Sequence, residues 1–225
     1  MKLLVLRPEP GASETAARAK AMGLEPVVAP LFAITGLAGA PVEPGRYDSV
    51  LLTSANGARH APPGAARLPC FAVGESTASA ARAAGFGEIR TGPCDGAAAA
   101  AMMAAAGVRR ALHLCGRDHL TVEAPGVAIE RRVVYVAEPV AHEGFEGPAV
   151  AMIHSPRGGA RFAELAGARA AIAVAAISPA AAAAVGEGWA AKAVAAAPRD
   201  QALLELAAEL CNHGFDVVRD GGDGI

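Results

Sequence analysis

The sequence is poor in aromatic residues, in long apolar runs and in excess charge of either sign. Of its 225 residues, 4% are Phe, Trp or Tyr, whereas 53% are hydrophobic when Ala is counted. The formal net charge is −2, so no basic surplus indicates a nucleic-acid partner. No apolar run is long enough to span a bilayer. The run Leu3–Leu6 is too short for a secretory signal, because Arg7 follows at once. We therefore expect a cytoplasmic protein that binds neither nucleic acid nor membrane.

Cysteine and histidine are too few and too scattered to indicate a disulfide framework or a metal site. No two of the four cysteines form a C-x-x-C pair. His113 and His119 lie six residues apart, which is not a ligand spacing for one helix face. We expect buried, reduced thiols, no metal and no other cofactor. The cysteines are Cys70, Cys94, Cys115 and Cys211.

Common nucleotide-binding and nucleophile motifs are also missing. There is no G-x-x-x-x-G-K-[ST] segment to wrap a nucleotide phosphate. No G-x-G-x-x-G follows the first apolar run, where Arg7-Pro8-Glu9-Pro10-Gly11 stands instead. The G-x-S-x-G turn of serine hydrolases is absent as well. These absences argue against a P-loop nucleotidase, a dinucleotide-dependent dehydrogenase and an α/β-hydrolase.

What the chain does have is a regular alternation of short apolar runs and Ala-rich amphipathic segments. Alternating strands and helices predict parallel sheets with helices on both faces. Strands are expected at residues 3–7, 26–29, 49–53, 70–73, 88–91, 111–114, 132–136, 150–154, 172–177 and 192–195, and helices at residues 13–22, 77–84, 97–106, 159–166, 180–186 and 199–212.

The chain also repeats itself at an offset of roughly a hundred residues. Thr53–Arg59 resembles His154–Arg161, and Gly85-Phe86 resembles Gly188-Trp189. A duplicated half-chain predicts two α/β lobes. Residues 1–33 are too few to bury a core alone, so we expect the chain to cross between the lobes twice. The expected first lobe is residues 1–33 plus 142–225, the inserted second lobe is residues 38–134, and the linkers are residues 34–37 and 135–141.

Short polar turns follow several of the predicted strands. Ligands of open parallel sheets bind at the carboxyl ends of strands, where helix N-termini present free N–H groups. The turns offer backbone donors and hydroxyls, and two of them add an arginine, which suits an anionic ligand with several carboxylates. Simple helix capping is the alternative for any single turn. The turns lie at residues 53–57, 73–77, 114–118, 155–159 and 177–179.

Together these residues resemble the uroporphyrinogen-III synthase family over nearly the whole chain. The resemblance implies two α/β lobes, with parallel sheets flanked by helices, that are joined by two extended linkers and have a cleft between them. It also implies a monomeric enzyme without a cofactor. The segments that carry the resemblance, by their order and spacing, are Leu6-Arg7-Pro8, Thr53–Gly57, Val73–Ala78, Leu114–Arg117, Val134-Tyr135, His154–Gly158 and Ile177-Ser178-Pro179.

The resemblance further implies a reaction and a set of site residues. The family closes hydroxymethylbilane, which bears eight carboxylates, to uroporphyrinogen III with loss of water and inversion of ring D through a spirocyclic intermediate. Tyr135 matches the family tyrosine proposed to help the hydroxyl leave, and a tyrosine packed for stability is the alternative. The candidate substrate-binding residues are Arg7, Ser54, Ala55, Asn56, Gly74, Thr77, Gly116, Arg117, Ser155, Pro156, Arg157, Gly158, Ser178, Ala180 and Ala181.

The turn around Ser178 departs from the family pattern. Ala180 and Ala181 stand where a counterpart of Thr77 is expected, and Ser178 replaces the usual glycine. This turn is therefore expected to contact the substrate only through its backbone N–H groups. A non-catalytic two-lobe protein that binds an anionic small molecule is the alternative function, and it would share the same cleft.

Overall fold

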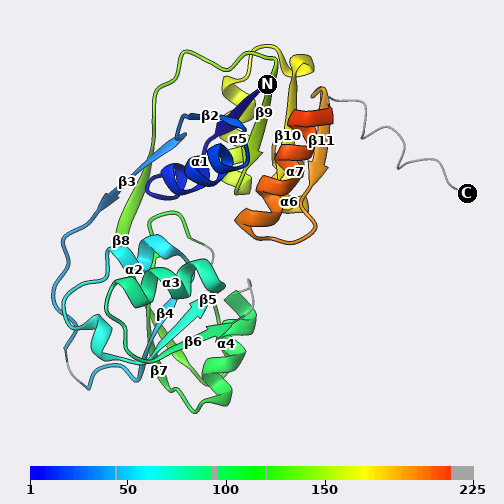
Figure 1. The fold of residues 1–225 in the computed structure, drawn as a ribbon. Coiled ribbons are helices and arrows are strands. Elements are labelled where there is room, and N and C mark those ends of the chain that lie inside the picture. The colour runs from blue at the N-terminus through cyan, green and yellow to red at the C-terminus, as the bar shows by residue number, and fades with distance from the viewer. Residues whose placement is uncertain (44, 93–95, 120, 214–225) are drawn as a thin grey trace, which may run out of the picture. The chain divides into compact units, whose positions relative to one another are not determined.

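The computed structural model describes residues 1–43, 45–92, 96–119 and 121–213, and over these residues the chain divides into two compact units. The terminal unit combines both ends of the chain, Met1–Ala33 and Pro139–Ile225. The central unit is Ile34–Glu138. Each unit has its own sheet (Figure 1). Each unit also has its own buried core.

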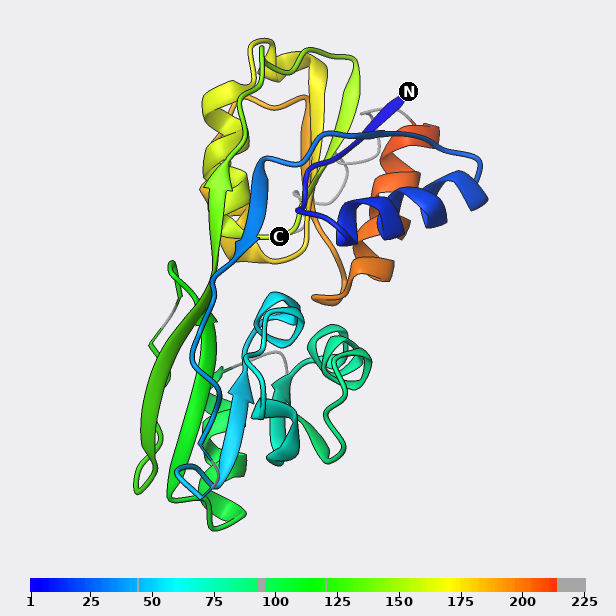
Figure 2. The same cartoon turned by 90° about the vertical axis from the view of Figure 1, so that its left-hand side faces the viewer.

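The sheet of the terminal unit has the strand order β11-β10-β9-β1-β2, and the paired strands run parallel. Helices α1 and α7 cover one face, where their Ala and Leu side chains meet inward residues of β1, β9 and β10. Figure 2 shows α1 in blue beside α7 in orange-red, with the yellow helix α5 on the other side of the sheet. The bounds are β1 (Lys2–Val5), α1 (Gly11–Ala21), β2 (Glu25–Val28), β9 (Ala149–Ile153), α5 (Pro156–Leu165), β10 (Ile172–Ala176), α6 (Pro179–Ala184), β11 (Ala191–Val194) and α7 (Asp200–His213).

The sheet of the central unit has the order β3-β8-β7-β4-β5-β6. Helices α2 and α3 pack side by side over one core, and α4 covers a second core on the other face. The bounds are β3 (Phe32–Gly36), β4 (Ser49–Leu52), α2 (Ala55–Arg59), β5 (Cys70–Val73), α3 (Glu75–Ala83), β6 (Ile89–Gly92), α4 (Gly96–Ala105), β7 (Arg110–Gly116) and β8 (Ala128–Pro139), with short 3₁₀ turns at Ala65–Arg67 and, in the terminal unit, Arg169–Ala171.

The two units repeat one topology. The run β4-α2-β5-α3-β6-α4 of the central unit has its counterpart in β9-α5-β10-α6-β11-α7 of the terminal unit. On the other side of the first strand, β4 pairs with β7, whereas β9 pairs with β1 from the start of the chain. The first strand of the protein therefore completes the sheet built by its last third, which explains the internal repeat as well as the discontinuous terminal unit.

Alanine and glycine let the helices lie close to the sheets. A Cβ on Gly57 of α2 would lie 2.6 Å from the carbonyl oxygen of Leu114 on β7. A Cβ on Gly159 of α5 would lie 3.0 Å from the carbonyl oxygen of Ala181 on α6. Such close contacts replace large side chains as the means of filling the core. None of the described helices is long and apolar enough to cross a membrane.

Several elements differ from the sequence-based expectation. Strand β3 and helix α2 were not predicted: β3 pairs along the edge of the sheet with β8, and α2 is too short to show a helical period. Residues 34–37 and 135–141, expected as linkers, lie largely in β3 and β8. Helices α3 and α5 begin two to three residues earlier than expected, because Gly74 and Ser155 are their N-caps.

Candidate functional site

A β-bulge near the end of β7 sets the direction of Tyr135. Cys115 pairs with Val133, but Gly116 pairs with Tyr135, so Val134 is an extra residue in β8. Side chains alternate between the faces of a regular strand, yet Val134 and Tyr135 both contact the core under α2 and α3. The bulge therefore turns the Tyr135 side chain toward α2, a re-aiming that bulges perform near functional sites.

The ring of Tyr135 packs directly against the backbone of Gly116. A Cβ on Gly116 would lie 2.7 Å from Cζ, 2.8 Å from Cε2 and 2.9 Å from Oη of Tyr135. The N–H of Arg117 donates to the carbonyl oxygen of Tyr135 at 3.0 Å. Gly116 and Arg117, both candidate substrate-binding residues, thus support the tyrosine through main-chain geometry.

The phenol of Tyr135 reaches the start of helix α2. Its Oη donates to Oγ of Ser54 at 3.2 Å, and the same Oγ accepts the N–H of Asn56 at 3.1 Å. Ser54 is therefore the N-cap of α2 and the partner of the tyrosine at once. His60, just after α2, lies with its ring centroid 6.2 Å from that of Tyr135. His60 was missed by the sequence reasoning, because it belongs to no motif and its position depends on α2.

Helix α3 follows β5, which is the parallel neighbour of β4. It therefore starts at the same carboxyl end of the strands as α2. Gly74 caps it with φ at 74°, a left-handed conformation that favours glycine, and its N–H donates to the carbonyl oxygen of Gly92 at 3.1 Å. Thr77 is the third residue of α3 and is 5% exposed. Because β4 and β5 are adjacent and α2 packs against α3, Thr77 and Ala55 belong to one group of helix starts.

In the terminal unit, Asp200 joins four elements. It is the first residue of α7 and accepts hydrogen bonds from Nη1 of Arg7 at 2.8 Å, Nε2 of His154 at 2.7 Å and Oγ1 of Thr15 at 3.0 Å. Arg18 of α1 forms an ion pair with the same carboxylate. Arg7, a candidate substrate-binding residue, is therefore held at the carboxyl end of β1 by Asp200. The sequence reasoning recognised Asp200 only as a helix start.

Charge and burial act in opposite directions on this network. Burial alone would raise the pKa of Asp200, but the hydrogen bonds from His154 and Arg18 and the charge of Arg7 outweigh it, so the pKa lies below its ordinary value. Burial also lowers the pKa of His154, despite the nearby carboxylate. The network therefore holds an ionised Asp200 next to a neutral His154 at neutral pH.

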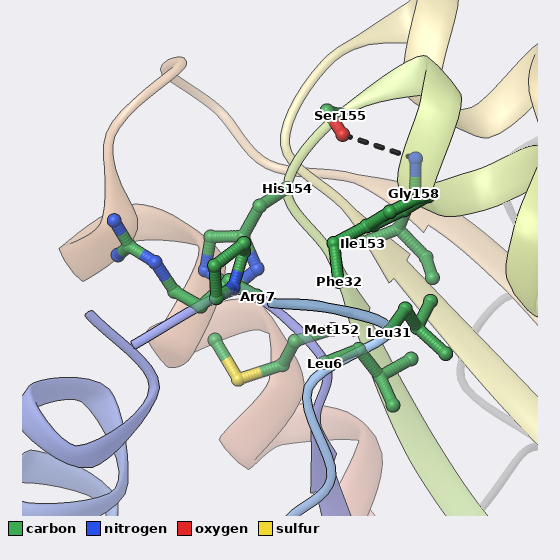
Figure 3. Close-up of a pocket in the computed structure, with 10 residues that line it drawn as sticks. Leu6, Arg7, Leu31, Phe32, Met152, Ile153, His154, Ser155 and Gly158 are labelled. Carbon is green, nitrogen blue, oxygen red and sulfur yellow. Dashed lines mark hydrogen bonds between the residues drawn. The ribbon is translucent and has the colours of Figure 1, made fainter. Parts of the chain in front are cut away.

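A small pocket opens beside this network at the carboxyl ends of β1 and β9 (Figure 3). Arg7, Phe32, His154, Ser155 and Gly158 contribute to its walls. Its volume of about 40 Å³ is far below the roughly 300 Å³ of a typical small-molecule site, so it can take no more than one small group of a ligand.

Serine caps begin the helices that follow β9 and β10. Oγ of Ser155 accepts the N–H of Gly158 at 3.1 Å, and Oγ of Ser178 accepts the N–H of Ala181 at 3.3 Å. A proline is the first residue of each helix, Pro156 in α5 and Pro179 in α6. Both serine side chains are therefore used as caps.

The remaining candidates at these helix starts differ in exposure. Arg157 is exposed, and its guanidinium lies 4.3 Å from the centroid of the Phe32 ring. Ala180 is exposed, whereas Ala181 is buried. Ala181 is the third residue of α6, as Thr77 is of α3. The threonine hydroxyl that this chain lacks would therefore lie at a buried position.

Within the described part of the chain, the cysteines and acidic residues form no metal centre. Among the described residues, no group of three His, Cys, Asp or Glu side chains is arranged to hold a metal ion. Cys70, Cys115 and Cys211 are free thiols, and Cys94 lies outside the described residues. Burial raises the pKa of the Cys70 thiol to about 12, so this thiol stays protonated.

Comparison with known proteins confirms the resemblance and the predicted α/β fold class. The family profile described as uroporphyrinogen-III synthase HemD matches residues 13–205. The search of curated proteins finds no match. The chain is similar to the crystal structure of uroporphyrinogen-III synthetase from Helicobacter pylori, with a TM-score of 0.66 and 14% identity over 93% of this chain and 98% of that one. It is also similar to a mutant uroporphyrinogen III synthase from the extremely thermophilic bacterium Thermus thermophilus, with a TM-score of 0.51 and 16% identity over 94% of this chain and 99% of that one. Because the family profile covers most of its length, the chain belongs to the uroporphyrinogen-III synthase family, whose members are cyclising lyases of haem biosynthesis.

Proposed function

We propose that this chain closes hydroxymethylbilane to uroporphyrinogen III and that Tyr135 assists the departure of the hydroxyl group. Family membership supports the reaction. The observation that supports the residue is the position of its phenol, which the bulge in β8, the backbone of Gly116 and the hydroxyl of Ser54 hold together. A buried tyrosine with a purely structural role also has a hydrogen-bond partner for its hydroxyl as a rule, so the activity of Tyr135→Phe is the observation that separates the two roles.

The reaction needs control of geometry more than a strong acid or base. Ring A expels its hydroxyl as water with electrons from its own pyrrole nitrogen, which leaves an azafulvene. The substituted carbon of ring D attacks that azafulvene, and a spirocyclic intermediate forms. Cleavage of a different bond of the spiro carbon and a second closure reverse ring D, and loss of a proton restores the aromatic pyrrole. The protein must hold the chain in the folded shape that favours this attack and stabilise developing charge with fixed dipoles.

The hydroxyls of Tyr135 and Ser54 form a short relay. Each hydroxyl has one proton to donate and lone pairs to accept. The N–H of Asn56 already donates to Oγ of Ser54. In the structure the phenol donates to Ser54. When the substrate hydroxyl departs, Ser54 rotates its own proton toward Oη of Tyr135, and the phenol proton turns to the departing oxygen. Each bond in such a chain strengthens the next, which makes the phenol a better donor.

We propose that the polar turns of each unit bind carboxylates of the substrate. In the central unit these are the starts of α2 and α3 and the turn at Gly116-Arg117, with Ala55 and Thr77 among their residues. In the terminal unit they are the turns after β1, β9 and β10, where Arg7 and Arg157 supply charge. The absence of a basic surplus supports an enzyme with no nucleic-acid partner. The monomeric state and the cytoplasmic location are proposed from the family resemblance alone.

Analysis of the porphyrin isomers made from hydroxymethylbilane tests this function. Spontaneous closure gives the type I isomer, so an enzyme must shift the product to type III. We expect Tyr135→Phe to lower kcat by about tenfold, somewhat less than a full general-acid contribution because the pyrrole itself expels the hydroxyl, with little change in the melting temperature. A protein that binds hydroxymethylbilane but leaves the type I outcome unchanged is the binding protein and not the enzyme. An unchanged kcat in Tyr135→Phe would remove the role of the phenol while the reaction itself stands.

A further inference from the structure

Two histidines lie behind the Tyr135 site. Leu112 and Leu114 of β7 face the core under α2 and α3, so His113 between them points to the opposite face of the sheet. His113 is fully buried, and the ring of His119 packs edge-on against it, with centroids 6.0 Å apart and an interplanar angle of 88°. Neither histidine belongs to the groups that contact the phenol.

Each histidine holds one of the two turns that contact Tyr135. Nε2 of His113 lies 2.9 Å from Oγ1 of Thr53, the residue just before Ser54. Nδ1 of His119 lies 3.0 Å from the carbonyl oxygen of Gly116 and 3.2 Å from that of Arg117. Because both partners of His119 are carbonyl oxygens, its Nδ1 carries the proton and donates to the turn.

A buried imidazole is a costly way to fill the core at this position. Nδ1 of His113 has no hydrogen-bond partner among the described residues, and an unpartnered buried polar atom lowers stability. Burial, with the charges of His119 and Arg131, lowers the pKa of His113 to about 4, so the ring is neutral at neutral pH. An aliphatic side chain would pack here without that penalty, but it could not bind Thr53.

We propose that His113 is a positioning residue for Tyr135, because its bond to Thr53 fixes Ser54, whose hydroxyl orients the phenol. His119 supports the other side of the phenol in the same way, through the Gly116 turn against which the ring packs. This inference rests on the proposed role of Tyr135 in the reaction. It predicts that a residue with no access to substrate controls turnover by controlling where one hydroxyl points.

The test compares kcat and KM for hydroxymethylbilane in single and double variants. His113→Leu removes the bond to Thr53, and His113→Gln keeps an amide nitrogen at the reach of Nε2. We expect His113→Leu to lower kcat by about fivefold to tenfold with KM within about twofold, and His113→Gln to recover most of the loss. In a Tyr135→Phe background, His113→Leu should lower kcat no further. Met103→Ala, which opens a cavity in the α4 core of the same unit, should lower the melting temperature and leave kcat unchanged.

The outcomes separate this inference from the proposed function. If Tyr135→Phe slows turnover but His113→Leu does not, or if His113→Leu has the same effect with and without the phenol, the positioning role is overturned. If Tyr135→Phe itself leaves kcat unchanged, the proposed role of Tyr135 fails and this inference fails with it. Should His113→Leu not fold, Thr53→Val removes the same hydrogen bond with little change of shape, and it must show the same dependence on Tyr135.

Discussion

The substitution Gly116→Ala tests whether the position of the Tyr135 ring matters for activity. The α-carbon of Gly116 lies under the ring of Tyr135, and a methyl group there would come within 2.7 Å of Cζ and 2.9 Å of Oη. Ordinary van der Waals contact for a Cβ begins at 3.4 Å. In Gly116→Ala the ring must therefore retreat by about 0.7 Å or more, because the backbone of β7 is held by its pairing with β8.

A displacement of this size acts on activity more than on folding. The Oη–Oγ distance to Ser54 is already 3.2 Å, so a shift of the ring away from Gly116 weakens or breaks that hydrogen bond. Misplacing a catalytic group by about 1 Å can reduce a rate by about a hundredfold. We expect Gly116→Ala to lower kcat by about tenfold to a hundredfold and stability by about 1–3 kcal/mol, the usual cost of overpacking.

The measurement is steady-state closure of hydroxymethylbilane, together with urea unfolding of the same preparations. Gly87→Ala is the matched control, because a Cβ at Gly87 meets nothing within 4 Å and the residue has no left-handed φ. Gly116→Ala combined with Tyr135→Phe should be no slower than the slower single variant, since both act on the same phenol. Full activity in Gly116→Ala, with normal folding, would refute the idea that the position of the Tyr135 ring matters.

Three further predictions concern stability, each measured by urea unfolding. The free energy of unfolding of wild type, compared with that of His113→Gln, should fall by about 2 kcal/mol from about pH 7.5 to about pH 5. The reason is that His113 binds a proton with the ordinary pKa of 6.5 in the unfolded chain, but with a pKa of about 4 in the folded protein. Asp200→Ala should cost about 2–4 kcal/mol at neutral pH, because it leaves Arg7 and His154 without their acceptor. The contribution of Asp200 should be present above about pH 4 and fade below it, since its pKa is lower in the folded state. Ala181→Thr should cost about 1–3 kcal/mol, because Ala181 is buried.

Controls make these expectations specific. His142→Gln, which removes a partly buried histidine of the terminal unit, should leave the acid-dependent difference at His113 unchanged. A pH-independent difference between wild type and His113→Gln would contradict the buried neutral state of that ring. Asp200→Asn should lose less than Asp200→Ala, because its amide oxygen can still accept one of the hydrogen bonds. A stabilised Ala181→Thr would show that the start of α6 has room for the hydroxyl that the family pattern leads one to expect.

The class of fold and the polar turns before the helices could be predicted from local patterns in the amino-acid sequence, whereas helix α2 and the first residues of α3 and α5 could not. Alternating apolar runs and amphipathic segments are local patterns, and they predicted the parallel α/β architecture because each strand and helix carries its own periodicity. Ser54, Ser155 and Ser178 could be named in advance for a similar reason, since a serine cap bonds to backbone groups only two or three residues away.

The way in which distant residues combine at the site could be seen only in the folded protein. Arg7 and Asp200 are 193 residues apart, and nothing local in either segment indicates their ion pair. The bulge that turns Tyr135 toward Ser54 depends on the register between β7 and β8, and the roles of Gly116 and His113 follow from that register. Such contacts arise when strands pair and cores pack, and these are long-range events that no short window of sequence can specify.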